Sequence, residues 1–139
     1  MKKTLISIAA IAFIALMITS AYAQVVIPEP DFCGCPRPCG FTPGFWKHNI
    51  QVYLGETNGE YSAFSRDGGA GVRDYWFSEG TKLTDTIMEN LLSDINFVYM
   101  TSLTFEQLLE ALQGPGWSAD RTNAANLFNW VAGYGPFED

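Results

Sequence analysis

The feature that most constrains the fold is a cluster of three cysteines followed at once by an aromatic turn rich in glycine and proline. Cys33, Cys35 and Cys39 fall within seven residues, and residues 42–48 read TPGFWKH. Sulfurs and one imidazole at such short spacing can hold a disulfide or a metal ion, and either would fix the chain at the start of the fold. The sequence therefore predicts that this segment serves architecture before reactivity.

The N-terminal 23 residues have the three parts of a cleavable export signal. Lys2 and Lys3 provide the positive start, residues 5–18 the apolar run, and residues 21–23 (Ala-Tyr-Ala) the small-residue cleavage site. The apolar run is shorter than the roughly 20 residues of a membrane-spanning helix. We therefore expect a signal peptide over residues 1–23 and a secreted or cell-surface protein with no membrane contact after cleavage.

The remaining chain is acidic and has the size of one domain. The 139 residues carry a formal net charge of −7, which becomes −9 when Lys2 and Lys3 leave with the signal peptide. Such a surface repels phosphate backbones, so we expect no nucleic-acid partner. Residues 24–42 are predicted to be an extended cysteine-rich segment, and residues 43–139 a single helical domain.

Two helices are predicted in the first half of that domain. Apolar spacing indicates a helix over residues 43–54, with Thr42 as its cap and Pro43 at its first position. Leucines and isoleucines at four-residue intervals predict a second helix over residues 81–95, and residues 97–100 are either its tail or a short strand. The glycine content of the sequence between these helices predicts an irregular middle.

The C-terminal third is predicted to be a helical hairpin. Thr104 and Gln107 have the spacing of a capping box, and the leucine-rich helix that follows stops at Gly114. A last helix begins near Ser118. Because the link between the two helices is short, we expect them to pack antiparallel with Trp117 at the bend. The fold class expected is a small, mainly α domain.

The cysteines and one histidine form the pattern C-x-C-x3-C-x8-H, from Cys33, Cys35, Cys39 and His48. Three sulfurs and a nitrogen are the ligand types of a tetrahedral zinc site. The spacing is not a common zinc-finger pattern, and an oxidising compartment favours a disulfide of Cys39 with Cys33 or Cys35. A disulfide is therefore preferred to zinc. His48 has no evident catalytic partner, so a hydrogen-bonded structural role is favoured and no enzyme activity is expected.

Aromatic residues in a small chain mostly build the core, because each buries about 150–250 Å². Residues 75–77 (Tyr-Trp-Phe) are an exception, since three consecutive aromatic side chains cannot all face inward. Tyr75 and Trp76 are therefore the candidates for a sugar-binding platform.

The TPGFWKH segment at residues 42–48 resembles the shared motif of a group of secreted bacterial and archaeal proteins of unknown function, roughly T-P/Q-G-F/Y-W-K-N-H-P after a cysteine. Residues 105–114 and 123–129 are similar to that group's leucine- and alanine-rich segments. This chain has Lys-His-Asn at residues 47–49 where the group has Lys-Asn-His, and one helical residue turns a side chain by about 100°. The resemblance implies an exported, mostly helical domain without an assigned activity.

These features favour a noncatalytic secreted or cell-surface protein with a structural or adhesive role that acts through protein contacts. Residues 24–32 are extended and apolar at their start, so we expect that they can add as a strand to a neighbouring subunit and support self-assembly. Two alternatives stay open. One is a carbohydrate-binding module that uses Tyr75 and Trp76; the other is a small metal-binding protein that uses the three cysteines and His48.

Overall fold

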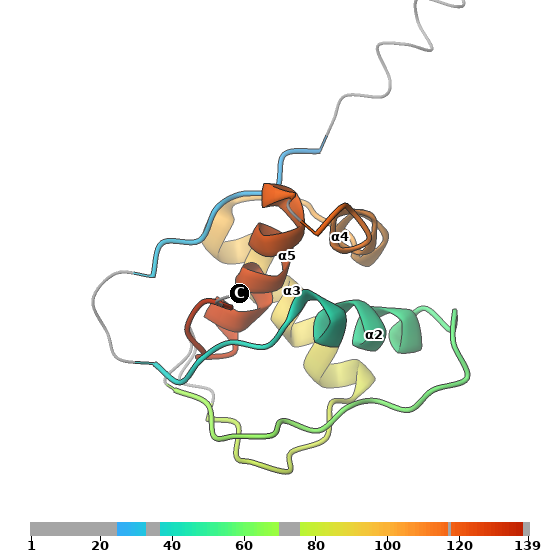
Figure 1. Ribbon diagram of the computed structural model, residues 1–139, viewed down its shortest axis with the longest axis vertical. Coiled ribbons are helices and arrows are strands. Elements are labelled where there is room, and N and C mark those ends of the chain that lie inside the picture. Colours follow the sequence, from blue (N-terminus) through green and yellow to red (C-terminus); the bar gives the residue numbers. More distant parts are fainter. Residues whose placement is uncertain (1–24, 33–36, 70–75, 117, 138–139) are drawn as a thin grey trace, which may run out of the picture.

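The computed structural model (Figure 1) describes residues 25–32, 37–69, 76–116 and 118–137. Within these ranges it contains the helices α2 (Pro43–Tyr53), α3 (Asp85–Tyr99), α4 (Phe105–Leu112) and α5 (Ala119–Val131). Helix α5 contacts the other three, and α2 also contacts α3 and α4. None of these helices has the length and apolar character needed to cross a bilayer. The predicted small, mainly helical domain is confirmed.

Helix α2 begins at Pro43, as the sequence of the aromatic turn predicts. The Thr42 hydroxyl accepts a hydrogen bond from the Phe45 N–H at 3.2 Å, and Pro43 occupies the first helical position. Trp46 is fully buried, and its ring stacks on Phe128 of α5 with the centroids 4.9 Å apart. The aromatic turn is therefore packed against α5 through Trp46.

Helix α3 starts later than the predicted residue 81. Lys82 forms an isolated antiparallel bridge with Ala63, so the chain is still extended there. Leu83 reaches the core from this extended segment, and Thr84 then caps the helix, which begins at Asp85. Four-residue spacing placed Leu83 on the helix because burial alone does not distinguish an extended residue from a helical one.

Residues 97–100, for which the sequence left a strand or a helix tail open, form the C-terminal end of α3 and its cap. The helix runs through Tyr99, and Met100 follows in the left-handed conformation with φ 51°. The Met100 N–H donates to the Asn96 carbonyl and closes the last turn. A strand is therefore not formed by this segment.

The two C-terminal helices form the predicted consecutive pair. The Thr104 hydroxyl accepts from the Gln107 N–H at 3.3 Å and the Thr104 N–H donates to the Gln107 side chain at 2.9 Å, so the capping box is confirmed. In Figure 1, α4 is seen nearly end-on while α5 runs across the view, so the packed helices cross instead of lying antiparallel. Trp117, expected at the bend, lies outside the described residues.

The glycine-rich middle forms an irregular ribbon that covers the core. Residues 60–69 and 76–83 run side by side at the lower edge of Figure 1, and the Phe64 N–H donates to the Thr81 carbonyl at 2.9 Å. Phe64 and Phe77 are both buried. In its described residues the middle is therefore irregular, as predicted, yet it supplies large side chains to the core.

The C-terminal tail pairs with the segment that precedes α2. The Gly40 N–H donates to the Pro136 carbonyl at 3.2 Å, and the Gly135 N–H donates to the Pro38 carbonyl at 2.6 Å. These residues are almost one hundred positions apart in the sequence. The tail therefore closes the domain against the start of the first described helix.

The extended segment before the cysteines lies on its own domain. Ile27 and Pro30 are buried, and the Asp31 carbonyl accepts a hydrogen bond from Trp130 Nε1 at 2.9 Å. Val26, by contrast, is 80% exposed. Donation of this whole segment to a neighbouring subunit would therefore require its release from α5.

Tyr134 makes the free energy of unfolding fall with increasing pH in the alkaline range. Its side chain is fully buried, its hydroxyl donates to the Arg66 carbonyl at 2.9 Å, and burial raises its pKa from 10.0 to about 12. As the pH rises, Tyr134 loses its proton in the unfolded chain before it does so in the folded protein. The stability that protonated Tyr134 contributes to the fold is therefore fully present below pH 10 and is lost as the pH rises from 10 toward about 12.

We expect Tyr134→Phe to lower the free energy of unfolding by about 1 kcal/mol at neutral pH, because one hydrogen bond is lost. The variant has no hydroxyl to ionise at this position, so it does not lose stability there at alkaline pH. The difference in free energy of unfolding between wild type and variant should therefore shrink by roughly 1 kcal/mol at about pH 11. Urea unfolding at the two pH values measures this change. A deficit that is the same at both would contradict the assignment.

Candidate binding groove

The aromatic turn is held by one buried amide, Asn129 of α5. Its Oδ1 accepts hydrogen bonds from the Phe41 N–H and from Trp46 Nε1, both at 2.9 Å. Its Nδ2 donates to the Phe41 carbonyl at 2.9 Å and to Asn126 Oδ1 at 3.2 Å. The sequence did not single out Asn129, because a polar residue on the buried face of a helix has no periodic signal.

The described residues include only Cys39 and His48 of the predicted cysteine–histidine site. Cys39 is an exposed free thiol among the described residues, and its two predicted partners, Cys33 and Cys35, lie outside them. The Nε2 atom of His48 lies 2.8 Å from the Glu60 carbonyl oxygen, the hydrogen bond expected of a structural histidine. Within the described part of the chain, no three His, Cys, Asp or Glu side chains are grouped to hold a metal. The cysteine link stays a prediction.

The predicted sugar platform is only partly within the described residues. Trp76 is 64% exposed, while the adjacent Phe77 is buried. Tyr75 lies outside the described residues. The outward orientation expected for Trp76 is confirmed, and carbohydrate binding stays a prediction.

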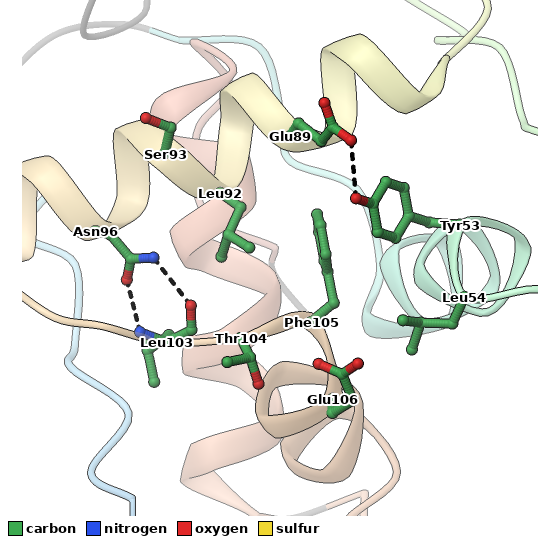
Figure 2. Close-up of a pocket in the computed structure, with 10 residues that line it drawn as sticks. All are labelled: Tyr53, Leu54, Glu89, Leu92, Ser93, Asn96, Leu103, Thr104, Phe105 and Glu106. Atoms are coloured by element: carbon green, nitrogen blue, oxygen red, sulfur yellow. Dashed lines mark hydrogen bonds between the residues drawn. The ribbon is translucent and has the colours of Figure 1, made fainter.

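The structure also forms a groove that the sequence did not predict. It has a volume of about 440 Å³ and lies where the end of α2, the middle of α3 and the start of α4 meet (Figure 2). Residues on one face of a helix recur at intervals of three and four, which explains the contribution of α3. The lining consists of Tyr53, Leu54, Glu89, Leu92, Ser93, Asn96, Leu103, Thr104, Phe105 and Glu106.

Tyr53 forms the wall of the groove on the α2 side. Its ring lies against Phe105, with the centroids 4.3 Å apart, and its hydroxyl donates to Glu89 Oε1 at 2.9 Å (Figure 2). This hydrogen bond raises the pKa of Tyr53 most, followed by desolvation and the charges of Glu89, Asp85 and Glu106. Tyr53 therefore stays protonated at neutral pH and orients the Glu89 carboxylate.

Asn96 fixes the opposite end of the groove. Its Nδ2 donates to the Leu103 carbonyl at 2.9 Å, and its Oδ1 accepts from the Leu103 N–H and from the Thr101 hydroxyl, both at 2.8 Å. The capping box then starts α4, which leaves Phe105 buried and Glu106 exposed. The loop between α3 and α4 is thus held in place by α3 itself.

The groove combines an apolar floor with carboxylates at its mouth. Leu92, Leu103 and Phe105 supply apolar surface, and the side chains of Glu89 and Glu106 are exposed. None of the ten lining residues is a lysine, arginine, histidine or cysteine. This lining offers hydrophobic contact and hydrogen-bond acceptors, the combination of groups with which binding sites hold and orient a ligand.

A scan against protein-family models finds no match, and searches of curated proteins and of solved structures find no significant match. The resemblance at residues 42–48 therefore stays a prediction.

Proposed function

We propose that this is a noncatalytic protein of the cell surface or extracellular space that acts through protein contacts, and that the groove between α2, α3 and α4 receives a segment of its partner. The single observation that carries the proposal is this recess of about 440 Å³ with an apolar floor. Such recesses take up the side chains that contribute most to binding between proteins. The export signal expected at residues 1–23 supports a contact outside the cell.

The exposure of the lining supports a protein partner. Ser93 and Thr104 are exposed, and Leu54 and Leu92 are half-buried, so solvent reaches the groove from outside. An open groove covers only one side of its occupant. The other side is covered when the occupant belongs to a larger molecule, as a side chain of a protein segment does.

A substitution that fills the groove tests this proposal. Ser93→Trp places a large ring among the lining residues, whereas Ser78→Trp places the same ring on an exposed part of the ribbon outside the groove. We expect peptides selected from a random library against the wild-type protein to bind Ser78→Trp equally well. Their affinity for Ser93→Trp should fall by about tenfold or more, which corresponds to roughly 1.4 kcal/mol. Isothermal titration calorimetry measures both.

Equal affinity for Ser93→Trp and the wild-type protein would contradict the proposal. So would a library that yields no binder. If polysaccharides, and not peptides, changed the tryptophan fluorescence, the carbohydrate-binding alternative at Trp76 would be favoured instead. Circular dichroism confirms that both tryptophan variants are folded before the comparison is made.

A further inference from the structure

The charges at the groove indicate which kind of side chain a partner would place there. Glu89 comes from α3 and Glu106 from α4, both side chains are exposed, and in the view of Figure 2 the ring of Phe105 lies between them. The lining holds no positive charge to balance them. The whole chain carries a formal net charge of −7, so the groove has the same sign as the protein around it.

We propose that the groove binds an arginine-bearing segment of a partner protein, with the arginine stem on the apolar floor and the guanidinium group between Glu89 and Glu106. This inference depends on the proposed function, because it names the partner chemistry of the same groove.

An arginine satisfies both parts of the groove. Its methylene stem covers apolar surface such as that of Leu92 and Phe105 while its charged end stays at the rim. The guanidinium group carries five donors in a plane, pairs with carboxylates in a bidentate manner and stacks on aromatic rings. An anionic segment would be repelled, and a wholly apolar one would cover two carboxylates without giving them a hydrogen-bond donor.

The carboxylate of Glu89 is already oriented for such a contact. The Tyr53 hydroxyl occupies Oε1, and a carboxylate has further lone pairs that accept hydrogen bonds. One turn earlier on α3, Asp85 accepts a hydrogen bond from the Tyr61 hydroxyl, so a second carboxylate is held by a tyrosine on the same side of the helix. The negative surface therefore extends beyond the groove, which favours the approach of a cation.

The nearby lysine does not neutralise this surface. Lys82 Nζ lies 2.7 Å from Glu60 Oε2, so its charge is paired in the ribbon. A cationic partner thus meets the carboxylates of Asp85, Glu89 and Glu106. The charges of these same three groups raise the pKa of Tyr53.

The test uses the purified protein and the acetylated, amidated peptide Gly-Leu-Arg-Leu-Gly, compared with the same peptide in which citrulline, a neutral residue of the same shape, replaces arginine. We expect the citrulline peptide to bind about tenfold more weakly, since the guanidinium faces two carboxylates. Glu89→Gln and Glu106→Gln should each weaken the arginine peptide by about two- to fivefold, the range of exposed ion pairs. Glu79→Gln, an exposed control outside the lining, should change its affinity less than about twofold.

Each outcome separates this inference from the proposed function. If the citrulline peptide bound as well as the arginine peptide and Ser93→Trp weakened both, the groove would be a binding site without selectivity for a cation, and only this inference would be overturned. If Ser93→Trp weakened neither peptide, the proposed function would fail as well. Equal losses in Glu79→Gln and Glu89→Gln would show an effect of net charge alone and would also overturn the inference. The glutamine variants keep the shape of the side chain, and their thermal unfolding confirms the fold.

Discussion

Asn129→Ala should lower the free energy of unfolding by about 3–5 kcal/mol, because it leaves several buried groups without a partner and each costs roughly 1–3 kcal/mol. The groups that lose their partner are the N–H and carbonyl of Phe41 and the indole N–H of Trp46. Asn126 loses one further donor. Urea unfolding followed by circular dichroism measures the loss.

Trp46→Phe is the matched control for this prediction. Phenylalanine retains an aromatic ring against Phe128, and the substitution removes the Trp46 hydrogen bond to Asn129. We expect a loss smaller than that of Asn129→Ala, and the two losses should not add in the double variant because the residues share one hydrogen-bond network. A loss below about 1 kcal/mol for Asn129→Ala would mean that the amide does not anchor the turn.

Gly40→Ala should destabilise the protein by about 3 kcal/mol, the upper part of the range for overpacked sites. A Cβ atom at Gly40 would lie 2.3 Å from the Gly135 carbonyl oxygen and 2.4 Å from Asn129 Nδ2. The backbone there has little freedom to move, since the Gly40 N–H also donates to the Pro136 carbonyl. The added methyl group would therefore separate the tail from the turn. Thermal unfolding of the variant measures the effect.

Gly44→Ala, four residues further along the chain, is the control. Gly44 lies exposed in the first turn of α2, and a Cβ atom there would meet only the Thr42 hydroxyl oxygen at an ordinary distance of 3.7 Å. We expect this variant to be more stable than wild type by about 0.5–1 kcal/mol, because alanine favours the helix and restricts the unfolded chain. Similar effects of the two substitutions would contradict the close approach at Gly40.

The described residues hold the aromatic turn through contacts that the sequence did not predict. We expected sulfur atoms to hold the turn. In the described residues, the amide of Asn129 and the backbone of residues 135–136 hold it. The exposed thiol of Cys39 contributes no described bond to this arrangement. A link between the cysteines would add to this attachment.

The helix starts could be predicted because their signals are local. Thr42 and Thr104 each satisfy a free N–H three residues later, and this geometry needs no distant partner. The start of α3 was predicted too early for the opposite reason. Leu83 is buried through the bridge between Lys82 and Ala63, a contact across nineteen positions that the local pattern does not contain.

The amino-acid sequence on its own determined the helical class of the domain, the aromatic start of α2 and the outward orientation of Trp76, because caps, turns and the spacing of apolar side chains act over a few residues. The groove was decided only by the tertiary structure. Tyr53, Glu89 and Glu106 lie on three helices and have no mutual signal in the chain. They meet because the packing of buried faces brings the helices together, and side chains at the edges of those faces then become neighbours.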